Sequence, residues 1–176
     1  MKNLLHVVFI LFIWIFTQAC RQKPGKNYNQ ETSVDQDGIS FIKNGIEGGL
    51  TEIKASGLAL TKSNNQRVIR FAKMMVDDHT KAGNELMKIE SDKLVLEKDL
   101  INSNHQIVLS QLSQKSGSAF DKAYLQMMIV DHENTIKLFD GASRNTDVRI
   151  SKFAVQTLPS IKMHLDSAKA INATLQ

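Results

Sequence analysis

The chain has 176 residues with a single cysteine, and Lys and Arg outnumber Asp and Glu by 22 to 18. One cysteine excludes an intramolecular disulfide, and the small positive excess, spread among acidic residues, excludes the basic stripe of a nucleic-acid-binding protein. Hydrophobic residues make up 42% of the chain, which is enough to build one core in a single domain.

The first 20 residues have the pattern of a bacterial lipoprotein signal peptide. Lys2 gives a basic start, residues 7–16 are an apolar run, and an alanine precedes Cys20. The run is too short to span a bilayer as a stable helix but suits a secretory signal. Thr17 stands where such sites usually carry leucine, and ordinary cleavage that leaves a free thiol is the alternative. We expect residues 1–19 to be removed and Cys20 to be lipidated, which would anchor the protein to the outer membrane of the cell envelope, facing the periplasm.

A tether and four long helices are expected to follow this leader. Residues 20–36 are polar, contain Pro24 and Gly25, and show no apolar periodicity, as is typical of a flexible linker. Apolar residues then recur at helical spacing, and no segment has the alternation of a strand. The pattern predicts helices at 37–63, 66–91, 118–142 and 146–174, with N-caps at Asp37, Ser118 and Thr146.

A connector of 26 residues, 92–117, separates the second helix from the third. A helix of that many residues is about 39 Å long, so the connector can cross the whole bundle, whereas a tight hairpin takes about two to eight residues. One long crossover between two helix hairpins is the ferritin-like topology. We therefore predict an all-α, ferritin-like four-helix bundle over 37–174. The amphipathic piece at 105–112 packs onto the bundle, or presents its apolar face to a second copy in a homo-oligomer.

Two stretches of the chain repeat one pattern, KMMVDDHT at 73–80 and QMMIVDHE at 126–133. His79 and His132 in these stretches, and His164 in the fourth helix, occupy positions where the stripe calls for an apolar residue. Glu52 in the first helix lies on a stripe of small residues, which predicts close approach of a neighbouring helix. Charged groups buried alone are expensive, so these residues need partners or a metal ion.

The four polar residues are expected at one level of the bundle. At 1.5 Å per residue, each lies about 20 to 27 Å from the start of its helix. One inward polar group from each helix is how bundles build metal sites. Asp78 and Asp131 point about 100° away from the histidines that follow them. They are expected to accept the far N–H of a histidine on the neighbouring helix, or to face water.

Four segments resemble the domain of unknown function 4142 family: GLTEIKASGLAL, VIRFAKMMVDDHTKAGNEL, FDKAYLQMMIVDHENTIKLF and FAVQTLPSIKMHLDSAK. The resemblance spans roughly residues 37–173. It implies an exported ferritin-like bundle, often labelled an outer-membrane protein, with no settled activity. The positions that match the family's pattern are Glu52, Asp78, His79, Asp131, His132, Leu158, Pro159 and His164.

Two functions are compatible with these patterns. The first is a non-catalytic binding or stress-protection module, in which the buried His, Asp and Glu residues form a network that fixes helix register. The alternative is a protein with one mid-bundle site for zinc, iron or copper, its ligands being Glu52, His79, His132 and His164. The Glu-x-x-His pairs of di-iron proteins are absent. No nucleophile motif or phosphate-binding loop occurs, so an enzyme is not expected.

The histidines also predict a pH dependence. Burial disfavours the charged imidazole and lowers its pKa, so the domain is expected to melt at a lower temperature at pH 5 than at pH 7. Several methionines flank the histidines and could supply soft ligands for copper, but methionine more often fills core space. We expect core packing of these side chains, which are Met74, Met75, Met127, Met128 and Met163.

Overall fold

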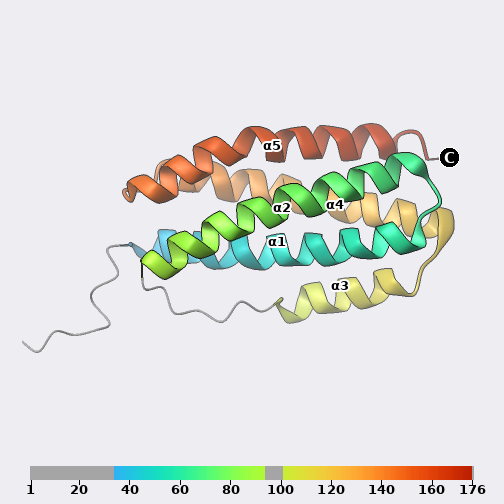
Figure 1. Ribbon diagram of the computed structural model, residues 1–176, viewed down its shortest axis with the longest axis horizontal. Helices are drawn as coiled ribbons and strands as arrows, with labels where there is room; N and C mark the ends of the chain where they lie inside the picture. Colours follow the sequence, from blue (N-terminus) through green and yellow to red (C-terminus); the bar gives the residue numbers. More distant parts are fainter. Residues whose placement is uncertain (1–33, 94–100, 176) are drawn as a thin grey trace, which may run out of the picture. The chain divides into compact units, whose positions relative to one another are not determined.

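The computed structural model describes residues 34–93 and 101–175, and all the regular structure in these ranges is helical (Figure 1). The predicted all-α four-helix bundle is confirmed. The predicted signal peptide, Cys20 and most of the tether lie outside the described residues. The helices are α1 (Gln36–Lys62), α2 (Gln66–Asp92), α3 (Ser103–Ser113), α4 (Gly117–Ala142) and α5 (Val148–Asn172).

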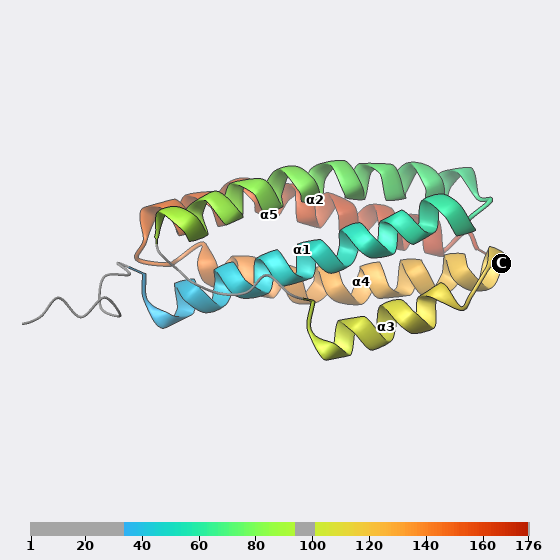
Figure 2. The same ribbon diagram turned by 60° about the horizontal axis from the view of Figure 1, so that its bottom comes forward.

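The bundle consists of two antiparallel helix hairpins, α1 with α2 and α4 with α5. The short helix α3 lies along the outside of α1 and α4, within the connector between the hairpins (Figure 2). This connector returns the chain to the end of the bundle at which α2 begins, so α2 and α4 run in the same direction. Leu112 of α3 is buried against the bundle, while Ile107 and Val108 are exposed.

Three of the four long helices begin with a side-chain cap. Asp35 accepts a hydrogen bond from the Gly38 N–H at 2.7 Å, and Asn65 and Asp147 cap α2 and α5 in the same way. The predicted caps at Asp37, Ser118 and Thr146 are each one or two residues away from the observed ones. Helical periodicity locates a helix but not its first residue, because a cap depends on the extended backbone just before the helix. Helix α4 instead follows Ser116, without a side-chain cap bond.

The apolar core is divided into two clusters along the bundle. One cluster gathers around Phe41, Phe139 and Phe153, whose rings are 4.9–6.2 Å apart. The other gathers around Phe71, Phe120 and Tyr124. In every long helix the polar residue singled out above lies between the part that joins one cluster and the part that joins the other. The fold therefore places one polar layer in the middle of an otherwise apolar interior.

Among the described residues, no helix combines the length and the hydropathy needed to cross a bilayer. The first described residue, Val34, is 5% exposed and packs in the cluster around Phe41. The folded bundle thus begins slightly earlier than the predicted boundary at 37.

Candidate metal centre

The four predicted ligands come together in the middle of the bundle, one from each long helix. Glu52, His132 and His164 are 3%, 1% and 2% exposed, and the side chain of His79 is 12% exposed. The centroids of the three imidazole rings lie 5.3–5.6 Å apart, which makes an almost equilateral triangle. One nitrogen atom from each ring lies within 4.8 Å of one nitrogen of each of the others. The structure therefore builds a compact three-histidine cluster with a carboxylate beside it.

Glu52 is the centre of charge in this cluster. Its Oε2 lies 2.7 Å from His79 Nε2, and its Oε1 lies 3.0 Å from His132 Nδ1. Burial acts to raise the pKa of Glu52, but the attraction of His79 and His132 outweighs burial and holds that pKa well below its usual range. Burial acts to lower the pKa of His79, but Glu52 outweighs it and raises that pKa above its usual value. In the absence of a metal ion, Glu52 and His79 therefore form a buried ion pair.

A fixed acceptor holds one nitrogen of every ring in the cluster. His79 Nδ1 and His132 Nδ1 lie 3.0 and 2.9 Å from the carbonyl oxygens of Met75 and Met128, one helical turn earlier. His164 Nε2 lies 2.9 Å from Asp78 Oδ2. Carbonyls and carboxylates only accept, so each of these nitrogens carries a hydrogen. This gives the repeated Met-Met stretches a local role, since the second methionine of each packs in the core and its carbonyl orients the histidine.

Three buried atoms of the cluster lack a hydrogen-bond partner among the described residues: Glu52 Oε1, His132 Nε2 and His164 Nδ1. The Nδ1 hydrogen of His132 is directed at the Met128 carbonyl, so Glu52 Oε1 lies 3.0 Å from that nitrogen without a well-directed bond. The two nitrogens are the lone-pair atoms of their rings, because the other nitrogen of each is the N–H. A buried polar group without a partner costs about 1–3 kcal/mol.

The two aspartates that precede the histidines have different surroundings. Asp78 on α2 accepts the N–H of His164 on α5, as expected for a residue that orients a ligand. Asp131 on α4 has no such bond, and its Oδ2 is buried without a partner among the described residues. The physical reason is the residue on the neighbouring helix. Asp78 faces His164 on α5, whereas the corresponding residue on α1, near Asp131, is Glu52, a carboxylate that cannot donate a hydrogen bond. Burial, followed by repulsion from Glu52, raises the pKa of Asp131 to about 6.

The pH expectation from the sequence needs a correction. Burial lowers the pKa of His164, as expected, although its bond to Asp78 opposes the shift. His79 differs, because its pKa is raised. The lowered pKa of His164 makes stability fall as pH drops below about 6.5, the ordinary value. The raised pKa of His79 has the opposite effect. It stabilises the fold below about pH 6.5, and this stabilisation is lost as the pH rises through the pKa of His79 in the folded state. The two contributions oppose each other, so burial alone does not set the slope between pH 5 and 7.

A second polar cluster was not predicted from the sequence. Glu47 Oε1 lies 2.7 Å from His105 Nδ1 and accepts the Asn102 N–H at 3.0 Å, which attaches the start of α3 to α1. The pairing joins residues 58 positions apart, and no periodicity within either helix indicates it. The small residues near Glu52 pack closely at Gly45, as expected, where an added Cβ would meet Leu86 at 2.7 Å, but not at Gly48 and Gly49. An added Cβ at Gly48 or Gly49 would meet no atom within 4 Å.

Asp131→Asn should stabilise the metal-free protein at pH 7 by about 1–3 kcal/mol, because it removes a carboxylate that is costly to ionise in the folded state. This range is lower than the full pKa shift would give, since Asp131 is partly exposed to solvent. The folded state binds the proton of Asp131 more tightly than the unfolded chain, so wild-type stability falls as pH rises from about 4 to 6. The gain in Asp131→Asn should vanish near pH 4. Urea unfolding at both pH values measures it, and Asp140→Asn, an exposed site on the same helix, is the control. A less stable Asp131→Asn at pH 7 would mean that the carboxylate has a stabilising partner.

Three comparisons with known proteins were informative to different degrees, and the structural one agrees with this architecture. Comparison with curated protein sequences finds no match. The crystal structure of a DUF305 fragment from Deinococcus radiodurans superimposes with a TM-score of 0.73 at 11% sequence identity, covering 81% of this chain and 99% of that one, which establishes a shared fold. The model of the family described as "Domain of unknown function (DUF4142)" matches residues 23–171. The chain therefore belongs to the DUF4142 family.

Proposed function

We propose that the bundle binds one transition-metal ion through His79, His132 and His164, with Glu52 as the accompanying carboxylate. The observation that carries the proposal is the pair of buried lone-pair nitrogens without a partner, His132 Nε2 and His164 Nδ1. A bound cation would use both lone pairs and the unpartnered Glu52 Oε1. A network that served only to hold the helices together would be expected to satisfy these atoms internally.

The surroundings of the rings also favour metal binding. Ligating histidines in proteins almost always donate their other N–H to a carbonyl or carboxylate, which fixes ring orientation. All three rings here have such an acceptor, Met75, Met128 or Asp78. Ligand nitrogens around a tetrahedral zinc ion are roughly 3.3 Å apart, since each Zn–N bond is about 2.0–2.1 Å. The three ligand nitrogens here lie up to 4.8 Å apart, so the rings would have to approach one another by as much as about 1.5 Å.

The donor set suits zinc, copper or iron, because imidazole with one carboxylate is a common site for all three. Met75 and Met128 are fully buried in the cluster around Phe71, which supports their use as core side chains. Contrary to the expectation of core packing, Met163 is 43% exposed and does not pack in the core. A single carboxylate with three histidines favours one metal ion over a carboxylate-bridged pair.

Zinc titration of the tag-free bundle tests this proposal. We expect about one ion per chain and a rise in the melting temperature, because an ion that binds only the folded state stabilises it. His132→Leu should abolish binding at zinc concentrations that saturate the wild type. Asp78→Leu removes the acceptor of the His164 N–H and should weaken binding about 10–100-fold.

Competition with a chromophoric chelator measures both affinities, and copper and iron are titrated in parallel. His105→Ala is the matched control, because His105 also pairs with a glutamate but lies outside the cluster. Binding that survives His132→Leu, or a wild type that binds none of the three metals, would refute the proposal.

The second candidate is a non-catalytic binding or stress-protection module whose polar layer is structural. The Glu52–His79 ion pair favours it, since this contact forms at 2.7 Å without any metal. In that case His79→Phe alone should destabilise by about 3–5 kcal/mol, because it leaves Glu52 buried and unpaired. The triple variant Glu52→Leu, His79→Phe, His132→Leu should be neutral or about 1–4 kcal/mol more stable. Urea unfolding measures both, and a zinc-dependent melting shift in the wild type argues against a purely structural layer.

We also propose that the protein is a lipid-anchored protein of the bacterial cell envelope, attached at Cys20 and facing the periplasm. The apolar run followed by alanine and cysteine supports this, as does the polar segment between Cys20 and the bundle. In a bacterial host grown with an alkyne-tagged fatty acid, the wild type should be labelled and should sediment with membranes. Cys20→Ala should lose the label. A wild type that takes up no label would exclude the lipid anchor.

A further inference from the structure

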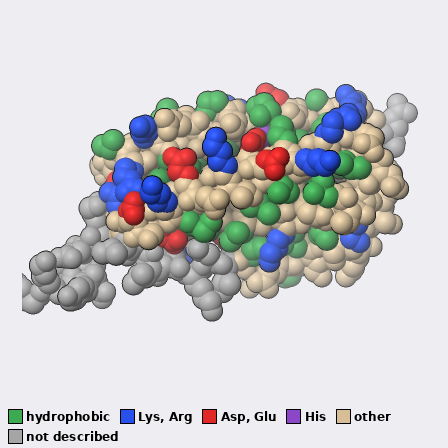
Figure 3. Space-filling model, in the orientation of Figure 1, with side chains coloured by type: hydrophobic (Ala, Val, Ile, Leu, Met, Phe, Trp, Pro, Cys, Tyr) green, Lys and Arg blue, Asp and Glu red, His purple; other side chains and the backbone are tan. Residues whose placement is uncertain are grey.

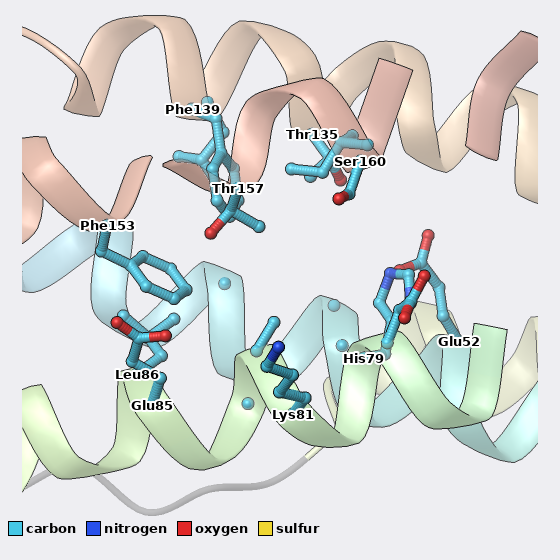
Figure 4. Close-up of a pocket in the computed structure, with 18 of the residues that line it drawn as sticks. Glu52, His79, Lys81, Glu85, Leu86, Thr135, Phe139, Phe153, Thr157 and Ser160 are labelled. Atoms are coloured by element: carbon cyan, nitrogen blue, oxygen red, sulfur yellow. The ribbon is translucent and has the colours of Figure 1, made fainter. Parts of the chain in front are cut away.

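A cavity of about 340 Å³ opens directly beside the histidine cluster. All four long helices line it, and Glu52 and His79 form one of its ends (Figure 4). His164, whose ring lies 5.3 Å from that of His79, also lines it. Phe153 and Leu86 lie at the other end, and Phe139 faces them from α4. Its volume is at the small end of the range for sites that bind small molecules, so it suits a ligand with one ring rather than two.

The sequence keeps this space empty by means of glycine. Gly48 and Gly49 on α1 line the cavity, and a Cβ at either position would meet nothing within 4 Å. Gly45, about one turn earlier, is different, because its Cβ would meet a methyl group of Leu86 at 2.7 Å. The helices therefore pack closely at Gly45 and separate at Gly48 and Gly49. Any larger side chain at these two positions would project into the cavity.

The walls combine apolar and polar surface in a defined order. The hydroxyl groups of Thr157 and Ser160 on α5 point into the space, and Lys81 on α2 reaches toward it between the two ends (Figure 4). Two of the three buried atoms without a partner, Glu52 Oε1 and His164 Nδ1, belong to residues that line it. These are acceptor atoms, which attract a cation and repel an anion. An anionic ligand at this end thus requires a metal ion between itself and the protein.

The mouth of the cavity lies between α2 and α5. Lys81 and Glu85 on α2, and Gln156 and Ser160 on α5, are lining residues that are also exposed. Figure 3 shows a small area of histidine surface between acidic side chains on the face of the bundle seen in Figure 1. A small molecule can therefore enter from solvent and reach the polar layer.

We propose that this cavity binds a small carboxylic acid with an aromatic body, its carboxylate completing the coordination of the metal ion. The ring lies toward Phe139, Phe153 and Leu86, beside Thr157, and Ser160 presents its hydroxyl between that end and the head group. The three histidines and Glu52 already supply four ligands, so the carboxylate of the acid binds as a fifth, and zinc can expand from four to five bonds. This inference rests on the proposed function, since it needs a bound metal ion.

The experiment uses the cobalt-substituted protein, with phenylacetate as the probe. Direct coordination of the carboxylate should change the visible absorption bands of Co²⁺ in a saturable manner. Acetate, which has the same head group without the ring, should need at least a tenfold higher concentration, because its methyl group buries far less apolar surface than a phenyl ring. Protein without metal should bind phenylacetate at least tenfold more weakly than the cobalt form in calorimetry.

Filling the cavity provides the structural control. Gly49→Leu should keep the cobalt spectrum and weaken phenylacetate binding at least tenfold. Gly57→Leu is the matched variant, because Gly57 lies on the same helix with free space around it but is exposed and outside the cavity. It should respond like the wild type. Thr157→Leu fills the same space from the opposite wall and should repeat the loss, which guards against a folding defect in the glycine variant.

The outcomes separate this inference from the metal proposal. If cobalt binds but phenylacetate leaves its spectrum unchanged, or if both filling variants respond like the wild type, the cavity is not a ligand site. Equal responses to acetate and phenylacetate would refute the proposal that the ligand has an aromatic ring. If cobalt does not bind at all, the proposed function itself fails, and the inference fails with it.

Discussion

One buried carboxylate constrains the rest of this bundle. Glu52 is ionised in the interior, where an isolated charge is expensive, so the neighbouring helices must supply positive charge and N–H groups. His79 and His132 provide them from α2 and α4. These polar side chains form a layer that divides the apolar core into two clusters. The register of the two hairpins is tied to this layer, because a shift of one hairpin along the other would separate Glu52 from His132 and Asp78 from His164.

The layer also joins the two hairpins. Glu52 and His79 come from the first hairpin, and His132 and His164 come from the second. The contacts of Glu52 with His132 and of Asp78 with His164 both cross between them. The carbonyls of Met75 and Met128 orient two of the rings from within their own helices. The imidazoles are therefore held in place before any ligand binds, as a site for a metal ion requires.

The two sides of the polar layer are packed differently. On one side the apolar cluster continues, and Ser56 bonds the Tyr124 hydroxyl at 2.8 Å in a fully buried contact. On the other side Gly48 and Gly49 leave a cavity that reaches the exposed faces of α2 and α5. The cluster is thus closed toward the core and accessible from solvent. The proposed metal site depends on this asymmetry, because an ion and its ligand would have to enter from solvent.

Helical periodicity in the sequence determined the four long helices, the crossover, and the level at which Glu52 and the three histidines meet. It could do so because each residue's face and depth follow from 3.6 residues per turn and 1.5 Å per residue. Tertiary structure alone decided which helix faces which. The two Asp-His pairs look equivalent in sequence, yet Asp78 accepts a hydrogen bond from His164, whereas Asp131 is repelled by the negative charge of Glu52. The glycines, the Glu47–His105 contact and the raised pKa of His79 likewise depend on neighbours from other helices. Local pattern determines the direction in which a side chain points, but the charge and the space that it encounters belong to the packed bundle.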